Sequence, residues 1–317
     1  MSLALLFSPQ GSQAVGMGRD LAAAGGAAYA TYAEADAVLG WSVSDVCWDG
    51  PVERLNDTRQ TQPCLLTTSV AAYRALGERT DLRPSIVAGH SVGEYAALVA
   101  AGVLEFAAAL RLVQRRATLM ADAGGAGGMA AVIGLARTEV DRVVGGIGRP
   151  TELVVANDNA PGQVVISGLI DALDAADEPM RAAGAKRIVR LPVSGAFHSP
   201  LMTRVAEGLA EAFEDEAWAD ARVPIVSNVT AEALTDASRI RALLAEQVRS
   251  PVEWVRCVER MASMGVDVAV ECGAGSALVG MLRRIAPSIR AVAAGDIGSL
   301  GAAADLVRSS APAGATA

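Results

Sequence analysis

Several kinds of residue and pattern are scarce in this chain, and each absence removes a class of function. Only 4% of the residues are aromatic, the formal net charge is −8, and no basic stripe with interleaved aromatic residues is present. A nucleic acid is therefore not an expected partner, because it would need a basic surface. The cysteines Cys47, Cys64, Cys257 and Cys272 form no closely spaced pair, so no zinc site is expected.

Long apolar runs are also missing. No segment reaches the ~20 apolar residues that a membrane-spanning helix needs. The first residues, "MSLALLFSPQ", have neither a basic start nor a cleavage site, so we interpret them as a first strand and not as a signal peptide. We therefore expect a cytoplasmic monomer with reduced thiols and no membrane contact.

Apolar residues are abundant, at 52% of the chain, and they form short strand-like runs between helical stretches. This alternation predicts an α/β fold with a mainly parallel sheet covered by helices. The length of 317 residues further suggests a large domain that carries a smaller one. The strand-like runs are residues 3–7, 85–89, 224–227, 266–271 and 289–293, and helices are predicted at 61–77, 105–123, 238–249 and 276–284.

One interval departs from this alternation. Residues 129–191 read strand, helix, strand, turn, strand, helix, strand, which is the β-α-β-β-α-β order of a ferredoxin-like unit. The glycine-rich entry "AGGAGG" and the proline at the exit are typical of an inserted domain. We predict a discontinuous large domain, residues 1–127 and 194–317, and an inserted domain, residues 128–193. The last stretch, "SSAPAGATA", is expected to be disordered.

The stretch "SIVAGHSVGEYAALVA" places Ser91 between two glycines where a strand-like run gives way to a helical one. This context favours the G-x-S-x-G elbow that presents a nucleophilic serine. The amide of Val92, at the start of the helix, could then stabilise an oxyanion. The alternative is a turn serine that caps the helix.

A nucleophilic serine needs a base, and the chain has only two histidines. His90 adjoins Ser91 and points away from it in such a turn, which leaves His198, in a loop after the inserted unit, as the candidate base. The alternative for His198 is a structural hydrogen bond at a helix entry. No carboxylate stands out as a third member, and a backbone carbonyl or an amide could orient the base instead.

Arg116 lies on the apolar stripe of the helix predicted at 105–123. An arginine on a buried face calls for an anion, and its planar fork binds a carboxylate at two points. It could equally extend to the surface or pair with a structural acid. In the loop "FSPQGSQ", after the first strand, the amide of Gln10 could be a second oxyanion donor. A phosphate-binding loop is the competing interpretation, but its lysine is absent.

Taken together, these segments resemble the malonyl-CoA:acyl carrier protein transacylases and the acyltransferase domains of fatty acid and polyketide synthases. The resemblance extends from Leu3 to about Ile297 and implies an α/β-hydrolase-like large domain with an inserted ferredoxin-like domain. It is carried by "FSPQGSQ", "GHSVGEYAAL", "RRATLM", "GGMAAVIGL", "ANDNAPGQVVISG", "SGAFHS", "SPVEW" and "ECGAGSALVGMLRRI", in this order.

The resemblance also implies a role for each candidate residue. Ser91 would be the acylated nucleophile and His198 the base, while Arg116 would hold the malonyl carboxylate. The remaining site residues would be Gln10 and Val92 as oxyanion donors, and Phe197, Gln247 and His90 on the substrate side. Phe197 matches malonyl-selective members, because a phenyl ring would crowd an α-methyl branch.

Two positions depart from the family's pattern. Pro9 stands where the family has glycine, and proline removes an amide and fixes φ, which bears on the geometry of the Gln10 donor. Ala274 stands where proline is common. The implied reaction is a ping-pong transfer from malonyl-CoA to the phosphopantetheine thiol of an acyl carrier protein, without a metal or other cofactor. Exposed arginines, Arg187, Arg190, Arg283 and Arg284, are expected near the cleft for the acidic carrier protein.

Three alternatives remain at this point. An acyl hydrolase of the same fold would pass the acyl group to water, but it would have no use for the Arg116 clamp. A malonyl transferase of a malonate decarboxylase system would use the same residues. A carrier-protein docking module that has lost catalysis would not need Ser91, His198, Arg116 and Gln247 together.

Overall fold

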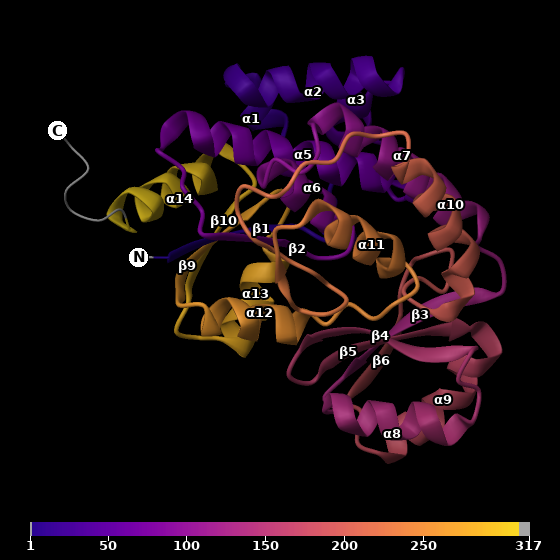
Figure 1. The fold of residues 1–317 in the computed structure, drawn as a ribbon. Helices are drawn as coiled ribbons and strands as arrows, with labels where there is room; N and C mark the ends of the chain where they lie inside the picture. The colour runs from indigo at the N-terminus through magenta and orange to yellow at the C-terminus, as the bar shows by residue number, and fades with distance from the viewer. Residues whose placement is uncertain (1, 311–317) are drawn as a thin grey trace.

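The computed structural model describes residues 2–310, which form two sheets with helices packed around them (Figure 1). Sheet A has the strand order β10-β9-β1-β2-β7-β8. Within the described residues its strand pairings are parallel, except that β7 and β8 are antiparallel, so the predicted mainly parallel sheet is confirmed. The strands are β1 (Ser2–Phe7), β2 (Ile86–Gly89), β7 (Ile225–Val226), β8 (Ala233–Leu234), β9 (Val266–Cys272) and β10 (Arg290–Ala294).

Strand β1 shows why helices cover both faces of sheet A. Leu3, Leu5 and Phe7 join one apolar cluster, while Ala4 and Leu6 join another, because successive side chains of a strand point to opposite faces. The first cluster packs against α5 (Thr58–Arg79), α6 (Gly93–Ala100), α7 (Phe106–Asp122) and α14 (Ile297–Ser310). The second packs against α12 (Trp254–Ser263) and α13 (Ala277–Ile285), which lie on the opposite side in Figure 1.

The helices predicted from periodicity are present, with ends that differ by a few residues. The helix expected at 61–77 is α5, which is longer at both ends. The helix expected at 238–249 is α11 (Ala237–Gln247). Helices for which no range was predicted include α1 (Arg19–Ala23), α2 (Gly26–Leu39), α3 (Val43–Trp48), α4 (Val52–Leu55) and α10 (Thr203–Phe213), with the 3₁₀ turn η1 (Pro200–Met202).

Sheet B is formed by one continuous segment of the chain, and the strands and helices of this segment follow the predicted order β-α-β-β-α-β. It is antiparallel, with the strand order β4-β5-β3-β6, and its helices α8 and α9 pack on one face through a separate apolar cluster. The elements are β3 (Gly127–Ile133), α8 (Arg137–Ile147), β4 (Leu153–Ala160), β5 (Gln163–Leu169), α9 (Ile170–Ala182) and β6 (Arg187–Arg190). The domain boundaries at 127/128 and 193/194 stay a prediction.

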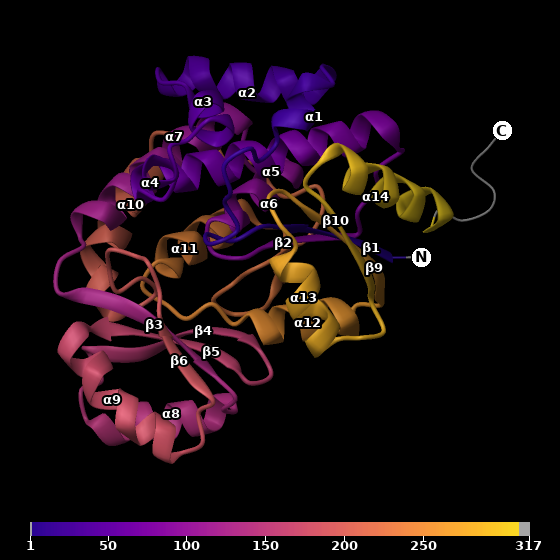
Figure 2. The same cartoon turned by 180° about the vertical axis from the view of Figure 1, so that it is seen from behind.

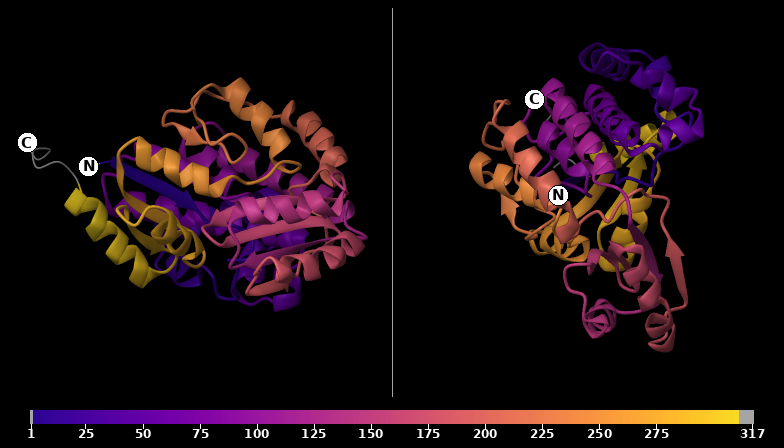
Figure 3. Two further views of the ribbon diagram at one scale, coloured as in Figure 1. Left: turned by 90° about the horizontal axis from the view of Figure 1, so that it is seen from below. Right: turned by 90° about the vertical axis from the view of Figure 1, so that its right-hand side faces the viewer.

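Sheet B and the C-terminal helix α14 lie at opposite ends of the molecule (Figures 2 and 3). Helix α14 ends at Ser310, so disorder from Ser309 onward is wrong for Ser309 and Ser310, and the rest of that stretch lies outside the described residues. In the part of the chain that the structure describes, no helix combines the length and the apolar character required to span a membrane.

Candidate active site

Ser91 stands at the sharp turn between β2 and α6. Its φ is 54°, in the left-handed region that few residues other than glycine adopt. The flanking glycines are required by space: a Cβ on Gly89 would lie 2.0 Å from the carbonyl carbon of Gly93, and one on Gly93 would lie 2.2 Å from the carbonyl oxygen of Phe7. Because both glycines lack a side chain, the backbone can make the sharp turn from strand to helix. The turn places Ser91 at the end of the parallel strands.

Asn228, which follows β7, holds this corner from the neighbouring strand. Its Nδ2 donates to the carbonyl of Gly89 at 2.7 Å, and its Oδ1 accepts from the amide of Ser91 at 2.7 Å. The side chain is completely buried. We did not predict this residue from the sequence, since an asparagine in a loop after a two-residue strand carries no distinctive pattern.

His198 lies against the serine hydroxyl, with Nε2 at 2.8 Å from Oγ of Ser91. Its Nδ1 lies 2.9 Å from the carbonyl oxygen of Gln247. Because a carbonyl can only accept, the proton sits on Nδ1, and the lone pair of Nε2 faces Ser91. Burial, followed by the charge of Arg116, lowers the pKa of His198 to about 3, so the imidazole is neutral at physiological pH.

Arg116, from α7, is 1% exposed and reaches the same hydroxyl. Its Nη2 donates to Oγ of Ser91 and to Oε1 of Gln247, both at 3.1 Å, and its Nη1 donates to Oε1 of Gln62 at 2.6 Å. These partners are uncharged, and Nε has no partner among the described residues. Burial lowers the pKa of the guanidinium, while the nearby Tyr95 and Glu94 side chains act in the opposite direction, and none of its direct hydrogen-bond partners carries a negative charge.

Of the two expected oxyanion donors, Val92 is part of the elbow and Gln10 lines the same cavity as Ser91. None of the hydrogen bonds among the described residues uses the amide of Gln10 or of Val92 as donor. Pro9 accommodates a turn, in which its carbonyl accepts from the amide of Ser12 at 3.3 Å. The preceding Ser8 is anchored by its hydroxyl to the buried carboxyl of Glu271 at 3.3 Å.

A cavity of about 200 Å³ opens over Ser91, between sheet A and sheet B. Phe197 lines it and is only 4% exposed. Gln10, His90 and His198 also line it, whereas Arg116 and Gln247 are not among its lining residues and reach Ser91 through the hydroxyl and the backbone carbonyl, respectively.

His90 faces sheet B rather than the nucleophile. Its Nε2 lies 2.7 Å from Oδ1 of Asn159 on β4, and its ring packs against Trp254 with the centroids 5.4 Å apart. Burial lowers the pKa of His90 to about 4, so the ring is neutral and donates from Nε2 to the asparagine oxygen. Among the described residues, no group of three His, Cys, Asp or Glu side chains could hold a metal ion.

Comparison with known proteins agrees with this geometry. Residues 4–300 match the family described as the acyl transferase domain. The chain belongs to this family. This acyl transferase domain is 41% identical to the malonyl CoA-acyl carrier protein transacylase of Escherichia coli strain K12 over 305 residues, which is 96% of the chain and 99% of the relative. It is 39% identical to the protein of that name from Bacillus subtilis strain 168, with 93% of each covered.

Solved structures show the same fold as this acyl transferase domain. An acyl carrier protein S-malonyltransferase from Vibrio cholerae superposes with a TM-score of 0.92 at 41% identity, covering 96% of this chain and all of that one. A second match, with a TM-score of 0.93 at 40% identity and the same coverage, is a malonyl-transacylase in complex with a type II polyketide synthase acyl carrier protein. The expected α/β fold with a second, antiparallel sheet is therefore confirmed.

Proposed function

We propose that this chain transfers the malonyl group of malonyl-CoA to the phosphopantetheine thiol of an acyl carrier protein, through a malonyl ester on Ser91. The observation that carries the proposal is the position of one hydroxyl between two groups. Oγ of Ser91 contacts the neutral Nε2 of His198 at 2.8 Å and the buried guanidinium of Arg116 at 3.1 Å. The names of the relatives and of the solved structures support malonyl as the acyl group.

In the first half-reaction, Nε2 of His198 takes the proton of the Ser91 hydroxyl as Oγ attacks the thioester carbonyl carbon. The negative charge on the carbonyl oxygen is stabilised by the amides of Val92 and Gln10. The carbon–sulfur bond then breaks, and His198 returns its proton to the sulfur of coenzyme A. Arg116 binds the free carboxylate of the malonyl group, because that anion supplies the negative charge that its neutral partners lack.

The second half-reaction reverses these steps with a different thiol. The phosphopantetheine thiol of the carrier protein gives its proton to His198 and attacks the malonyl ester, and Ser91 recovers its proton as the thioester forms. The carbonyl of Gln247 holds the imidazole throughout and stabilises its protonated state, in place of a carboxylate. The chemistry requires no metal or other cofactor, so we expect a chelator to leave the transfer rate unchanged.

The nearest competing functions differ in what accepts the malonyl group. An acyl hydrolase would pass the acyl group to water, and a buried arginine beside the nucleophile gives such an enzyme no advantage with uncharged acyl groups. A transferase of a malonate decarboxylase system would load in the same way and differ only in the carrier protein.

We also propose that the protein acts as a cytoplasmic monomer.

The carrier protein is acidic in the proposed reaction and would meet exposed arginines at the cavity mouth. Arg187 and Arg283 are exposed, whereas Arg190 pairs with Asp174 and Asp177 on α9. Replacing Arg187 and Arg283 by glutamate is expected to slow transfer to the carrier protein without slowing the loading of Ser91. Unimpaired transfer would remove these two residues from the docking surface.

The mass of the intact protein after brief exposure to malonyl-CoA tests the proposal directly. We expect a malonyl adduct that Ser91→Ala abolishes, that forms poorly from acetyl-CoA, and that disappears when a holo carrier protein is added. Arg116→Ala is expected to lower malonyl loading and leave acetyl loading largely intact. Release of coenzyme A without an adduct would indicate a hydrolase, and neither adduct nor release would indicate a docking module.

A further inference from the structure

Glu94 carries a carboxyl group into the interior beneath the nucleophile. It lies in the first turn of α6, three residues after Ser91, and is 4% exposed. Burial raises the pKa of this carboxyl to about 7. Placing a carboxyl here costs free energy unless it is hydrogen-bonded, so its partners show what it does.

The partners of Glu94 are two residues that hold the active site. Nε2 of Gln247 donates to Oε2 of Glu94 at 2.6 Å, and the amide of Asn228 donates to the same oxygen at 3.4 Å. Asn228 is the residue that clamps the elbow at Gly89 and Ser91. The carboxyl therefore lies at the junction of α6, the loop after β7 and the end of α11.

Gln247 connects Glu94 to both groups that contact the serine hydroxyl. Its carbonyl accepts from Nδ1 of His198, and its Oε1 accepts from Nη2 of Arg116. Its Nε2 donates to Glu94 and to the carbonyl of Ser91. An amide can be turned over without changing its shape, and a carboxyl acceptor at 2.6 Å selects the orientation in which Oε1 meets the guanidinium.

We propose that Glu94 is a positioning residue that fixes Gln247, and through Gln247 sets both the His198 imidazole and the Arg116 guanidinium against the Ser91 hydroxyl. The kinetic part of its test rests on the proposed malonyl transfer. One side chain would thus couple the rate of acylation to the preference for a carboxylate-bearing acyl group. Glu94 is not among the residues that line the cavity over Ser91.

The experiment compares Glu94→Ala, Glu94→Gln, Gln247→Ala and the double variant Glu94→Ala/Gln247→Ala. Glu246→Gln is the matched control, because Glu246 is on the same helix as Gln247 but pairs with Arg249 at the surface. Two rates are measured, the loading of Ser91 from malonyl-CoA and from acetyl-CoA. Thermal unfolding of each variant separates a loss of fold from a loss of alignment.

We expect Glu94→Ala to slow malonyl loading by about 10-fold or more and to lower the malonyl-to-acetyl ratio, and Glu94→Gln to recover part of both losses, because its amide oxygen can still accept. The double variant should be within about 2-fold of Gln247→Ala, since residues that act through one another are not additive. Losses that multiply in the double variant, or an unchanged ratio in Glu94→Ala, would overturn the proposal. If Glu94→Ala does not fold, the same cycle with Glu94→Gln decides.

A second readout needs no turnover and so separates this proposal from the function. With two histidines in the chain, nitrogen-labelled histidine gives two pairs of ring-nitrogen signals, which single variants assign. Glu94→Ala should shift the signals of the His198 ring and leave those of His90 in place. If the wild-type protein fails to load malonyl but Glu94→Ala still shifts the His198 signals, the proposed function is rejected and the role of Glu94 is kept. An unchanged His198 signal would reject that role.

Discussion

At the scale of single residues, the proposed reaction depends on a histidine that stays uncharged. Burial against the guanidinium of Arg116 lowers the pKa of His198 to about 3, and its Nδ1 is tied to the carbonyl of Gln247. The folded protein therefore resists protonating this ring, while the unfolded chain accepts the proton near the ordinary pKa of about 6.5. The stability associated with the neutral ring is present above about pH 6.5 and is lost as the pH falls toward 3.

The first prediction concerns the pH dependence of acylation. Since His198 is already neutral at pH 5, single-turnover loading of Ser91 should show no histidine titration step between pH 5 and 8, and His198→Ala should slow loading by about 10²–10⁴-fold. Rapid quenching followed by intact mass measures both. A step that vanishes in Glu94→Gln would belong to Glu94, whereas a step near pH 6.5 that survives in that variant would contradict the expected state of His198.

The second prediction concerns Phe197, whose ring lines the cavity beside His198. Phe197→Ala should raise the rate of methylmalonyl loading relative to malonyl loading by about 10-fold, because removing the ring makes room for an α-methyl branch. Competition between the two thioesters, read by mass, gives the ratio. Phe213→Ala is the control: Phe213 is equally buried but packs against Trp218, away from the cavity, so that variant should lose stability without changing the ratio.

At the scale of one element, the corner between β2 and α6 is set by contacts that leave no room for a side chain. The carbonyl of Phe7 on β1 lies 2.2 Å from where a Cβ on Gly93 would be. The turn is therefore constrained both by its own residues, through the contact of Gly89 with Gly93, and by the neighbouring strand β1. Asn228, which follows the neighbouring strand β7, also holds the turn through hydrogen bonds to Ser91 and Gly89.

The third prediction follows from this crowding. Gly93→Ala should lower the free energy of unfolding by about 2–4 kcal/mol and slow Ser91 loading, because either β1 or the elbow must move. Gly145→Ala is the matched change in α8, where a Cβ would meet no atom within 4 Å, and it should stabilise by about 0.5–1 kcal/mol. Urea unfolding compares the two. Equal stability of both variants would show that the corner tolerates a side chain.

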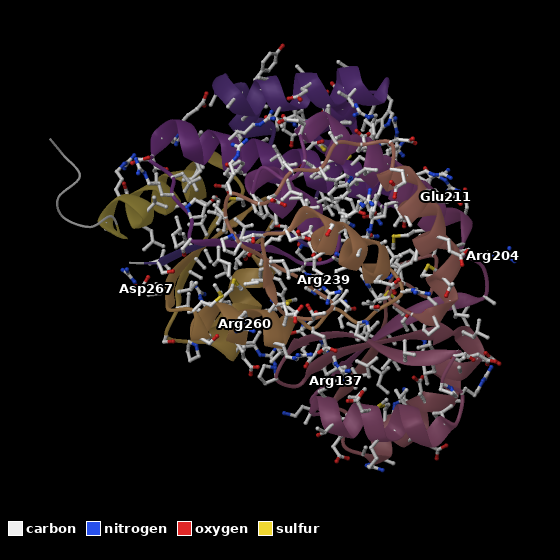
Figure 4. All side chains as sticks on the ribbon, viewed as in Figure 1. Arg137, Arg204, Glu211, Arg239, Arg260 and Asp267 are labelled. Atoms are coloured by element: carbon white, nitrogen blue, oxygen red, sulfur yellow. The ribbon has the colours of Figure 1, made fainter. Side chains whose placement is uncertain are left out.

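At the scale of the whole molecule, the two sheets meet at the cavity through backbone and side-chain contacts. Val252, just before α12, pairs with β4: its amide donates to Ala156 at 2.8 Å and its carbonyl accepts from Asp158 at 3.0 Å. Nearby, Nη1 of Arg137 on α8 lies 3.6 Å from Oε2 of Glu253. Arg137 is labelled in Figure 4. Sheet B is therefore fixed against the helices that cover sheet A.

The fourth prediction tests this coupling at the site. Asn159 on β4 accepts from His90, the neighbour of the nucleophile, at 2.7 Å in a buried setting. Asn159→Ala should lower the free energy of unfolding by about 1–3 kcal/mol, because it leaves a buried imidazole without its hydrogen-bond partner. It should also slow Ser91 loading. Asn56→Ala, which removes an exposed bond to Gln13, should leave stability unchanged. Equal melting temperatures for both variants would contradict the expected role of Asn159.

The sequence by itself determined the features that depend on local order along the chain. Alternating apolar runs predicted the parallel sheet, and the strand and helix order of residues 129–191 predicted the composition of sheet B. The glycines around Ser91 predicted a turn that presents a serine, and elimination among two histidines selected His198. The inferences about the two sheets succeed because hydrophobic periodicity acts between residues that are close in sequence, whereas the roles of Ser91 as nucleophile and His198 as base stay predictions.

Only the tertiary structure decided how the site is held. The serine region is reached from separate elements by Asn228, Gln62 and Asn159, and Glu94 meets its partner Gln247 from a distant helix. The partner of His198 is a backbone carbonyl, which any residue at position 247 would supply. No sequence pattern marks such partners, because they are brought together by the crossing of strands and helices far apart in the chain. The burial that makes His198 neutral and leaves the charge of Arg116 without an ion pair likewise exists only after folding.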